Sequence, residues 1–329
     1  MPTDGSETRI RGVGLVLSGG GTVGHAFHSG VLAAIAEATG WDARTAGLAV
    51  GTSAGSLVAA MLRAGFPAPD LAARVLGRPL SEEGRRVAEL LRELKDLPAW
   101  SAARPRRGMA APQLLRRGLL RPGSVRLAAL VAAALPPGRV SAAPLGDAVR
   151  RLFGSGWPQQ PTWICAVALD DGRRVVFGRE GAPPPALADA VAASCAIPSY
   201  FEPVTIGGRR YVDGGVHSVT NLDVVAGLGL DLVLVSSAMS GASGSLRGSV
   251  DLPVRAASRA RLAREAAAVR RAGTEVVIFQ PGAADLAAMG INLMDAGRSR
   301  AVVTQALEST RQRLKRDDLR ARLRQFIEG

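Results

Sequence analysis

The sequence predicts an α/β protein with parallel strands, and three observations support this fold class. Two strand–turn–helix units follow each other within the first 65 residues. The strands are continuous apolar runs, a pattern typical of strands that are buried on both faces of a sheet. The 329 residues are 47% hydrophobic and 21% charged, so the chain can bury a large core and is neither disordered nor fibrous.

The first unit starts with the apolar run of residues 11–18, which leads through a glycine-rich stretch into a helix expected over residues 25–38. The second unit starts with a strand over residues 47–50, and its helix is expected to end at about residue 64. In each unit a glycine-containing turn joins the strand to the helix.

Residues 70–140 interrupt this rhythm and are predicted to form a basic, helical cap insertion. One or two charged helices are expected over residues 71–95. Residues 104–139 contain eight arginines, five prolines and no acidic residue. Two interpretations remain open: a basic, amphipathic surface that lies on an anionic bilayer, and a solvated cap that covers the site.

The α/β rhythm resumes after this insertion. Strands are expected over residues 162–169, 174–177, 204–206, 209–212, 232–235 and 275–279, and helices over residues 186–196 and 254–271. Residues 236–249, nine of which are Ser or Gly, are expected to form a mobile loop. An amphipathic helical tail is expected over residues 296–327.

The net charge of +13 favours anionic partners, either phospholipid or nucleic acid. Aromatic residues make up only 4% of the chain, which argues against a stacking platform for single-stranded nucleic acid. Cys165 and Cys195 both lie in apolar runs, so we expect two buried, reduced thiols rather than a disulfide framework.

Neither a membrane span nor a secretory signal is predicted. The longest uninterrupted apolar run covers nine residues, 127–135, whereas a spanning helix needs about 20. The first twenty residues contain charged side chains and no long apolar segment. We therefore expect a cytoplasmic protein, peripheral to the inner face of the membrane.

The strongest local motif is Gly51-Thr52-Ser53-Ala54-Gly55, between a predicted strand and a predicted helix. A sharp strand-to-helix turn exposes the serine oxygen, and the flanking glycines, Gly51 and Gly55, remove side chains that would clash there. The turn also places Ser53 at a helix N-terminus, where amide donors favour developing negative charge. The motif therefore predicts a nucleophilic serine.

The glycine-rich stretch 19–24 has two interpretations. Its successive backbone N–H groups can form an oxyanion hole. Gly19, Gly21 and Gly24 also fit the dinucleotide fingerprint G-x-G-x-x-G. A dinucleotide site needs an acidic residue at the end of the second strand, and Asp42 comes before that strand. Nucleotide binding is therefore the second hypothesis.

A nucleophilic serine needs a base, and the chain has only three histidines. His25 and His28 do not follow an acid in the Ser…Asp…His order of α/β-hydrolases. His217 follows Asp213 by only four residues, too close for the usual triad geometry. The remaining candidate is Asp213 itself, in an Asp-Gly-Gly turn that leaves its carboxylate free to point into a site.

Four motifs, in their order and spacing, resemble those of patatin-like phospholipases over residues 12–236. They are Gly19-Gly20-Gly21 with Gly24, Gly51-Thr52-Ser53-Ala54-Gly55, Ala193-Ser194-Cys195-Ala196-Ile197-Pro198 with Phe201 and Pro203, and Asp213-Gly214-Gly215. The resemblance implies a three-layer α/β/α sandwich with a parallel-rich central sheet, and a single domain over residues 1–329.

The same resemblance implies a lipid acyl hydrolase with a Ser–Asp dyad, similar to cytosolic phospholipase A2. Ser53 would attack a lipid ester carbonyl, Asp213 would accept its proton, and an acyl-enzyme would follow. The oxyanion hole would comprise Gly19, Gly20, Gly21 and Ala54. This chemistry needs no metal or cofactor. The implied partner is a lipid or phospholipid, with peripheral contact to an anionic membrane surface and no nucleic acid.

The chain departs from the family pattern at Val23, where the glycine-rich loop usually carries Arg or Lys. The departure removes a positive charge that would steady the loop or the oxyanion, and His25 or an arginine of the cap are candidate substitutes. It motivates a third hypothesis, a catalytically inert lipid-binding protein with the same fold.

Overall fold

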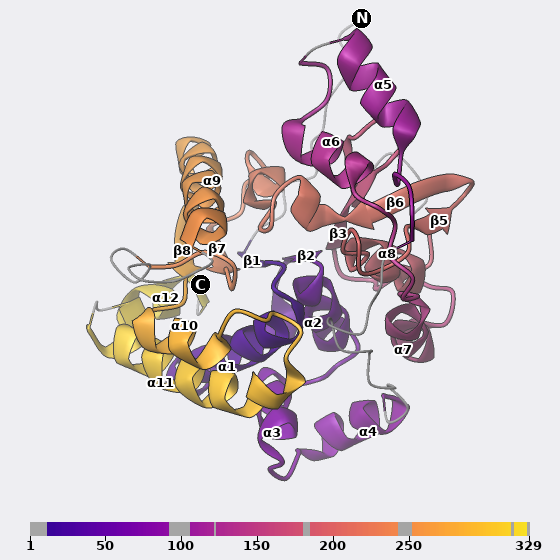
Figure 1. Ribbon diagram of the computed structural model, residues 1–329. Helices are drawn as coiled ribbons and strands as arrows, with labels where there is room; N and C mark the ends of the chain where they lie inside the picture. Colours follow the sequence, from indigo (N-terminus) through magenta and orange to yellow (C-terminus); the bar gives the residue numbers. More distant parts are fainter. Residues whose placement is uncertain are drawn as a thin grey trace, which may run out of the picture.

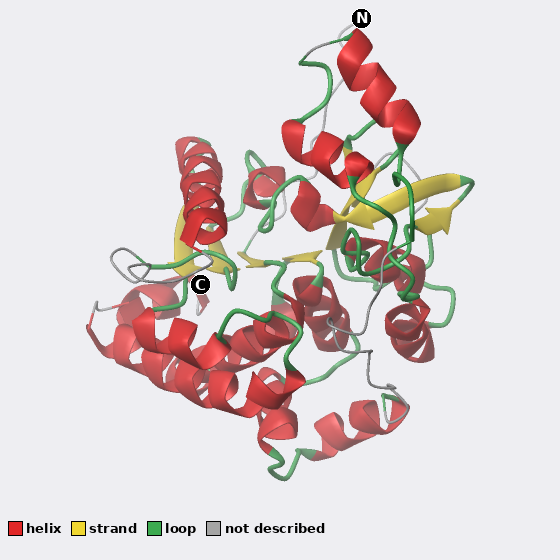
Figure 2. Cartoon of the chain, in the orientation of Figure 1, coloured by secondary structure: helices red, strands yellow, loops and turns green. Residues whose placement is uncertain are grey.

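A computed structural model describes residues 12–91, 106–121, 123–179, 185–242, 252–316 and 319–327. Its centre is an eight-stranded sheet with helices on both faces (Figures 1 and 2). The strands are β1 (Val13–Leu17), β2 (Leu48–Thr52), β3 (Thr162–Ala168), β4 (Arg174–Phe177), β5 (Val204–Ile206), β6 (Arg209–Asp213), β7 (Leu232–Ser236) and β8 (Glu275–Phe279). Their order is β5-β6-β3-β2-β1-β7-β8, and β4 pairs with β3.

The central part of the sheet is parallel. β3, β2, β1, β7 and β8 run in the same direction, whereas β4 and β6 pair antiparallel with β3, and β5 with β6. The apolar strand patterns fit this position, because every residue of β1, β2, β3 and β7 is buried. The predicted fold class, an α/β/α sandwich with a parallel-rich sheet, is confirmed.

Helices form the two outer layers. They are α1 (Gly21–Thr39), α2 (Ala54–Arg63), α3 (Ala68–Leu76), α4 (Glu82–Leu90), α5 (Pro112–Leu120), α6 (Leu127–Ala134), α7 (Ala143–Phe153), α8 (Leu187–Ser194), α9 (Leu252–Arg271), α10 (Ala283–Met289), α11 (Ser299–Arg316) and α12 (Leu319–Ile327). Short 3-10 turns are η1 (Ala43–Thr45), η3 (Gly214–Val216), η4 (Leu222–Val225) and η5 (Ala296–Arg298).

Alternate side chains of the strands face different helical layers. Leu15 and Leu17 of β1 pack in the core of α1, α2, α3, α10, α11 and α12, whereas Val16 packs in the core under α9 and η4. In β3, Ile164 faces α7 and α8, and Val167 faces α5 and α6. This alternation follows from the two-residue period of a strand and builds the three layers.

Residues 70–140, predicted as a cap insertion, are helical in most of the part that is described, and they lie in two places. α3 packs against α1 and α11 in the large core, whereas α5 and α6 form a hairpin on the opposite face of the sheet. Figure 1 shows this hairpin projecting beyond the rest of the fold. Residues 92–105, within the predicted stretch, lie outside the described residues.

Several boundaries differ from the sequence prediction. α1 begins at Gly21 rather than at residue 25, because the last glycines of the loop already form its first turn. β2 extends to Thr52, directly before Ser53. Helices α7 and α10 were not predicted. Of the expected loop 236–249, residues 243–249 lie outside the described residues.

Candidate active site

Ser53 lies on a strained turn between β2 and α2. Its backbone has φ 51° and ψ −122°, in a region that residues with a side chain rarely adopt. The amide of Ser53 donates to the Ser194 hydroxyl at 2.8 Å, and that hydroxyl donates to the Cys165 carbonyl at 2.7 Å. The side chain of Ser194 thus ties the strained turn to β3.

The glycines of the motif are required by close packing. A Cβ atom on Gly55 would come within 2.2 Å of the Leu17 carbonyl oxygen, and one on Gly51 within 2.5 Å of the Ser56 Cα atom. Neither backbone neighbour can give way. The expected role of Gly51 and Gly55 in forming the turn therefore has a direct physical reason.

Strand register brings Asp213 next to this turn. Thr52 is paired with Cys165 of β3, and Asp213 is paired with Ala166, the next residue of β3. The ends of β2 and β6 therefore meet beside the same segment of β3. Two segments that are 160 positions apart in the chain are neighbours for this reason.

The carboxylate of Asp213 is buried and hydrogen-bonded. It accepts from the Gly215 amide at 2.7 Å, the Ser53 hydroxyl lies beside it, and Asp213 is only 6% exposed. Burial raises the pKa of Asp213 to about 6, and the nearby Ser53 hydroxyl and the Gly215 amide partly oppose that rise. A carboxylate with this pKa is mostly ionised at neutral pH and still binds a proton readily.

The glycine-rich loop lies beside Ser53. An added Cβ on Gly19 would be 3.4 Å from the Ser53 Cβ. The Gly19 amide already donates to the Val219 carbonyl at 2.8 Å, so this expected oxyanion donor is occupied. For the amides of Gly20, Gly21 and Ala54, no acceptor is found among the described residues. These three N–H groups remain as candidates.

A cavity of about 630 Å³ opens over Ser53 and Asp213. Its lining residues are Gly19, Gly20, Gly21, Ser53, Ile197, Pro198, Asp213, Gly215, Val216, Val219, Met239, Ile291, Asn292, Leu293 and Met294. Asp213 is the one charged residue among them. The other side chains are mostly apolar, and the largely exposed Ile291 lies at the opening. Such a cavity suits an apolar chain attached to a polar, reacting group.

No histidine is among these lining residues. His28 is fully buried between the Ser236 hydroxyl and the Ser18 carbonyl, at 2.7 and 2.8 Å from its ring nitrogens. Burial lowers the pKa of His28 to about 4, and burial together with Arg74 lowers that of His25 to about 4. Neither imidazole carries a charge at neutral pH.

Val23 belongs to the large core and is fully buried. Its side chain packs among apolar residues of the layer that contains α1. Because His25 is uncharged at neutral pH, it does not replace the cation that the family pattern usually has at this position.

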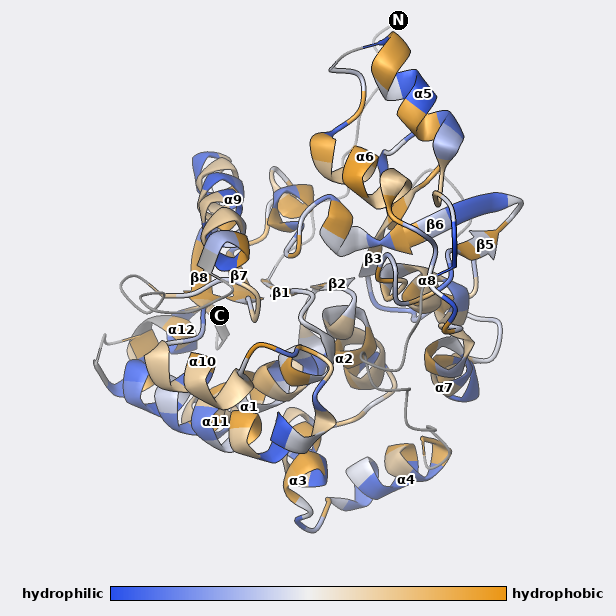
Figure 3. Cartoon of the chain, viewed as in Figure 1, coloured by the Kyte–Doolittle hydropathy of each residue, from blue (hydrophilic) through white to orange (hydrophobic). Residues whose placement is uncertain are grey.

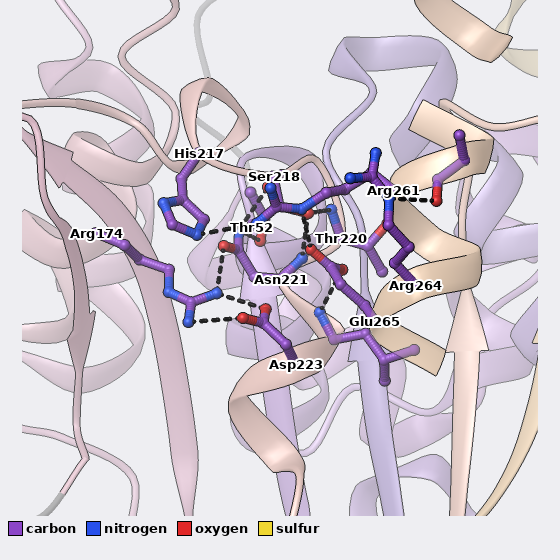
Figure 4. A network of polar contacts seen from close by, with 12 residues as sticks. Thr52, Arg174, His217, Ser218, Thr220, Asn221, Asp223, Arg261, Arg264 and Glu265 are labelled. Atoms are coloured by element: carbon purple, nitrogen blue, oxygen red, sulfur yellow. Dashed lines mark hydrogen bonds and ion pairs between the residues drawn. The ribbon is translucent and has the colours of Figure 1, made fainter. Parts of the chain in front are cut away.

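Asn221 connects the two halves of the site, a role that sequence reasoning missed (Figure 4). It is fully buried and left-handed, with φ 53°. Its Nδ2 atom donates to the Thr52 hydroxyl at 3.1 Å and to the Gly214 and Ser218 carbonyls at 3.4 and 2.5 Å. Thr52 precedes Ser53 and Gly214 follows Asp213, so one amide group contacts both segments.

Charged side chains lie around the side-chain amide of Asn221. Arg174 donates to the Oδ1 atom of Asn221 at 3.2 Å and forms two hydrogen bonds with Asp223, at 2.6 and 3.0 Å. Arg261 pairs with Glu265 at 2.8 Å and contacts Nε2 of His217 at 3.2 Å. A left-handed asparagine between distant segments leaves no local pattern in a single sequence, which explains why it was not predicted.

Dinucleotide binding would require an acidic residue at the end of β2, and the structure has none there. β2 ends at Thr52 and is followed directly by Ser53, so no carboxylate stands at the end of that strand to hold a ribose. Among the described residues, no group of three or more His, Cys, Asp or Glu side chains is placed to hold a metal ion.

A serine on a strained strand-to-helix turn, within a three-layer α/β fold, is the arrangement typical of hydrolases with a serine nucleophile. The family model of the patatin-like phospholipases matches residues 15–226, and the chain belongs to this family. Its general activity is therefore that of a lipid acyl hydrolase, and its partners are lipids. Among solved structures, VipD from Legionella pneumophila is similar to this chain. The two are 14% identical, the match covers 91% of this chain and 67% of VipD, and the TM-score is 0.37.

Within the described ranges, none of the helices combines the length and the apolar character that crossing a bilayer requires.

Proposed function

We propose that the protein hydrolyses carboxylic esters of lipids with Ser53 as nucleophile and Asp213 as its base. The observation that carries this proposal is the placement of the Ser53 hydroxyl next to the buried Asp213 carboxylate, at the floor of an apolar cavity. No third group is needed to orient Asp213, because the Gly215 amide already fixes one of its oxygens.

In the first half-reaction, Oγ of Ser53 attacks the ester carbonyl carbon while its proton passes to Asp213. The tetrahedral intermediate then collapses. The bond between the carbonyl carbon and the alcohol oxygen breaks, and Asp213 returns the proton to the departing alcohol. The fatty acyl group is left as an ester on Ser53.

In the second half-reaction, water attacks the acyl carbon and gives a proton to Asp213. The bond to Oγ breaks, the proton returns to Ser53, and the fatty acid leaves. The pKa of about 6 suits Asp213 to both directions of transfer, since an acid–base group works best when its pKa lies near the working pH.

Negative charge on the carbonyl oxygen is stabilised by the amides of Gly20, Gly21 and Ala54. Ala54 is the first residue of α2, where the helix dipole adds to the donor effect. Gly19 contributes space beside Ser53 rather than a donor. Removing one such donor typically costs about 10²–10³-fold in rate, so three together account for a large part of the catalysis.

The apolar lining favours an acyl chain over a charged headgroup inside the cavity. Val216, Val219 and Met239 line the cavity, and the largely exposed Ile291 lies at its opening. The headgroup would then remain near the opening, and the strongly basic protein would approach an anionic membrane surface peripherally.

The test is ester hydrolysis and covalent labelling by a fluorophosphonate probe, with wild type and Ser53→Ala measured in parallel. Ser53→Ala removes only Oγ, so the fold should persist while hydrolysis falls by at least about 10³-fold and labelling disappears. Ser258→Ala, on α9, is the matched control and should behave as wild type. Retained labelling in Ser53→Ala would refute the proposal, and lipid binding without any turnover in wild type would identify an inert lipid-binding protein.

A further inference from the structure

The helical hairpin of α5 and α6 exposes an unusual amount of apolar surface. Three of its leucines are largely exposed: Leu119 at 81%, Leu127 at 76% and Leu120 at 69%. Val131, on the next turns of α6, is also more than half exposed. Leucines that lie this open on a projecting element are typical of a surface that binds something apolar.

Arginines accompany these leucines. Arg116, Arg117 and Arg121 lie on and directly after α5, and Figure 3 shows hydrophilic and hydrophobic residues interleaved along this helix. No acidic residue occurs between residues 104 and 139. Within the described ranges, no carboxylate lies at ion-pair distance from these three arginines. We refer to Arg116, Arg117, Arg121, Leu119, Leu120, Leu127 and Val131 together as the outer face of the hairpin.

The inner face of the hairpin is firmly packed. Its buried residues are Ala110, Ala111, Leu114, Val125, Ala129 and Ala133, which pack on Val167 and Val212 of the sheet and on Leu169, directly after β3. Arg210 of β6 also donates to the Ala110 carbonyl at 2.9 Å. Other residues already form the buried core of the hairpin, so the exposed leucines are not needed to pack it against the sheet.

The hairpin stands beside the cavity. α6 contacts η3, the turn that directly follows Asp213. Val216, in that turn, packs against the inner face of the hairpin and also lines the cavity. A surface that docks through this hairpin would thus lie close to the opening.

We propose that the outer face of the hairpin docks on an anionic lipid bilayer, with its leucines in the interface and its arginines on the lipid phosphates. This placement is typical of amphipathic segments that lie on a membrane. The inference deepens the proposed function, since it names the surface that delivers lipid to the site, but docking itself requires no catalysis.

Charge distinguishes a bilayer from other occupants. A symmetric dimer through this face would bring the same arginines of two copies together, and no carboxylate is available there to balance them. A nucleic-acid backbone would satisfy the arginines but would leave the leucines in water. An anionic bilayer satisfies both kinds of side chain.

The first test is a fluorescence measurement in a Ser53→Ala background, where no hydrolysis can occur. Cys165 and Cys195 are free and buried, and burial raises the pKa of both thiols to about 12, so a new surface cysteine can be labelled selectively. Leu120→Cys carrying an environment-sensitive dye should shift to the blue with phosphatidylglycerol-containing vesicles. Leu90→Cys, on α4, is the control and should not shift. Absence of a shift at Leu120, or an equal shift at both, would overturn the proposal.

The second test is co-sedimentation with vesicles of phosphatidylcholine, with and without phosphatidylglycerol. Replacing Arg116, Arg117 and Arg121 with Ser should weaken binding to the anionic vesicles roughly a hundredfold. Replacing Arg259, Arg264 and Arg271 of α9 with Ser removes the same charge and should have little effect. Equal losses in both variants would show that only net charge matters and would overturn the proposal.

Hydrolysis of a soluble short-chain ester should stay unchanged in the hairpin variants. This readout separates the two proposals: failure of docking leaves that activity intact, whereas failure of the proposed function abolishes it in wild type as well. A change from dimer to monomer in Leu119→Ser, with vesicle binding unchanged, would assign the outer face to a second copy of the chain and overturn docking on a bilayer.

Discussion

Two parts of the lining of the cavity, its floor and one of its walls, differ in chemistry and in their place in the chain. The floor carries Ser53 and Asp213 and lies inside the region that the family model matches, residues 15–226. A second part of the lining, which we call the wall, consists of Met239 and residues 291–294, all beyond residue 226. The floor is held by backbone register and hydrogen bonds, whereas the wall presents apolar bulk.

This difference shows which parts of the site tolerate change. On the floor, the Ser53 turn depends on close contacts of 2.2 and 2.5 Å that exclude any side chain at Gly55 and Gly51. On the wall, methionine and leucine fill space without a directional contact to Ser53 or Asp213. Substitutions of the floor should therefore change the rate of the reaction, and substitutions of the wall should change the choice of substrate.

Among substitutions of the floor residues, Asp213→Asn should cause the largest loss of activity after Ser53→Ala. Asparagine keeps the shape and the contact with the Gly215 amide but cannot accept the proton, so kcat/KM should fall by about 10²–10⁴-fold. In wild type, kcat/KM should rise through about pH 6, as the carboxyl ionises, and then level off. A wild-type profile without that rise, or a fully active Asp213→Asn variant, would break the assignment of the base.

The same variant should be more stable than wild type at neutral pH. The pKa of Asp213 is about 6 in the folded protein and about 3.9 in an unfolded chain, so the folded state binds the proton more tightly. Ionisation of Asp213 thus destabilises the fold, fully above pH 6 and not at all below about pH 4. Asp213→Asn should gain about 2–3 kcal/mol at pH 7.5, an order-of-magnitude value, and lose this gain near pH 4. Thermal unfolding at both pH values measures it.

Asn221→Gly should produce a smaller loss, because the residue acts through its neighbours. Glycine accepts the left-handed backbone and deletes only the amide that contacts Thr52 and Gly214. If this amide aligns the two segments, kcat/KM should fall by roughly 10–10²-fold in protein that is still folded at the assay temperature. Asn221→Ala should cost further stability through backbone strain.

The rate of fluorophosphonate labelling provides the decisive readout for Asn221. Misalignment of Ser53 and Asp213 slows labelling of the folded enzyme, whereas a purely structural role lowers Tm and leaves labelling of the folded fraction unchanged. Labelling at the wild-type rate in Asn221→Gly would show that Asn221 contributes only to the stability of the fold.

Sequence reasoning was sufficient for the fold class and for the family. The continuous apolar strands, the Gly-x-Ser-x-Gly turn and the Asp-Gly-Gly turn are local patterns, and each has a local physical cause. Asp213 is favoured over the histidines by chain order and by its Asp-Gly-Gly turn, and its role as the base stays a prediction. Its adjacency to Ser53 in space has its reason in the register of β2 and β6 on β3.

The remaining features depend on contacts between distant segments. The Gly19 amide was expected to be a free donor, but it is bonded to Val219, which is 200 positions away. The wall residues 291–294 follow α10, a helix with no clear sequence signal, and their role depends on where the loop after it lies. Such long-range packing leaves no periodicity for a single sequence to reveal.

Substitutions in the wall should alter the preference for acyl-chain length, by a smaller factor than the floor substitutions alter kcat/KM. Met239→Ala and Met294→Ala each enlarge the cavity, so long acyl esters should gain relative to short ones by about tenfold, as expected for a few buried methylene groups. The ratio of kcat/KM values for long and short p-nitrophenyl esters measures this shift. Leu90→Ala, on the surface of α4, is the control. An unchanged ratio in both methionine variants would place the acyl chain elsewhere.

His217→Gln should have the smallest effect and is the sharpest check on the dyad. His217 does not line the cavity, and burial together with Arg174, Arg126 and Arg261 lowers its pKa to about 3. An imidazole with this pKa is too weak a base to assist Ser53 near neutrality. Glutamine can still accept from Arg261, so kcat/KM should change by less than about threefold and the pH profile should stay the same. If His217→Gln lost more activity than Asp213→Asn, the base would have to be the histidine, and the cavity floor would need a different mechanism.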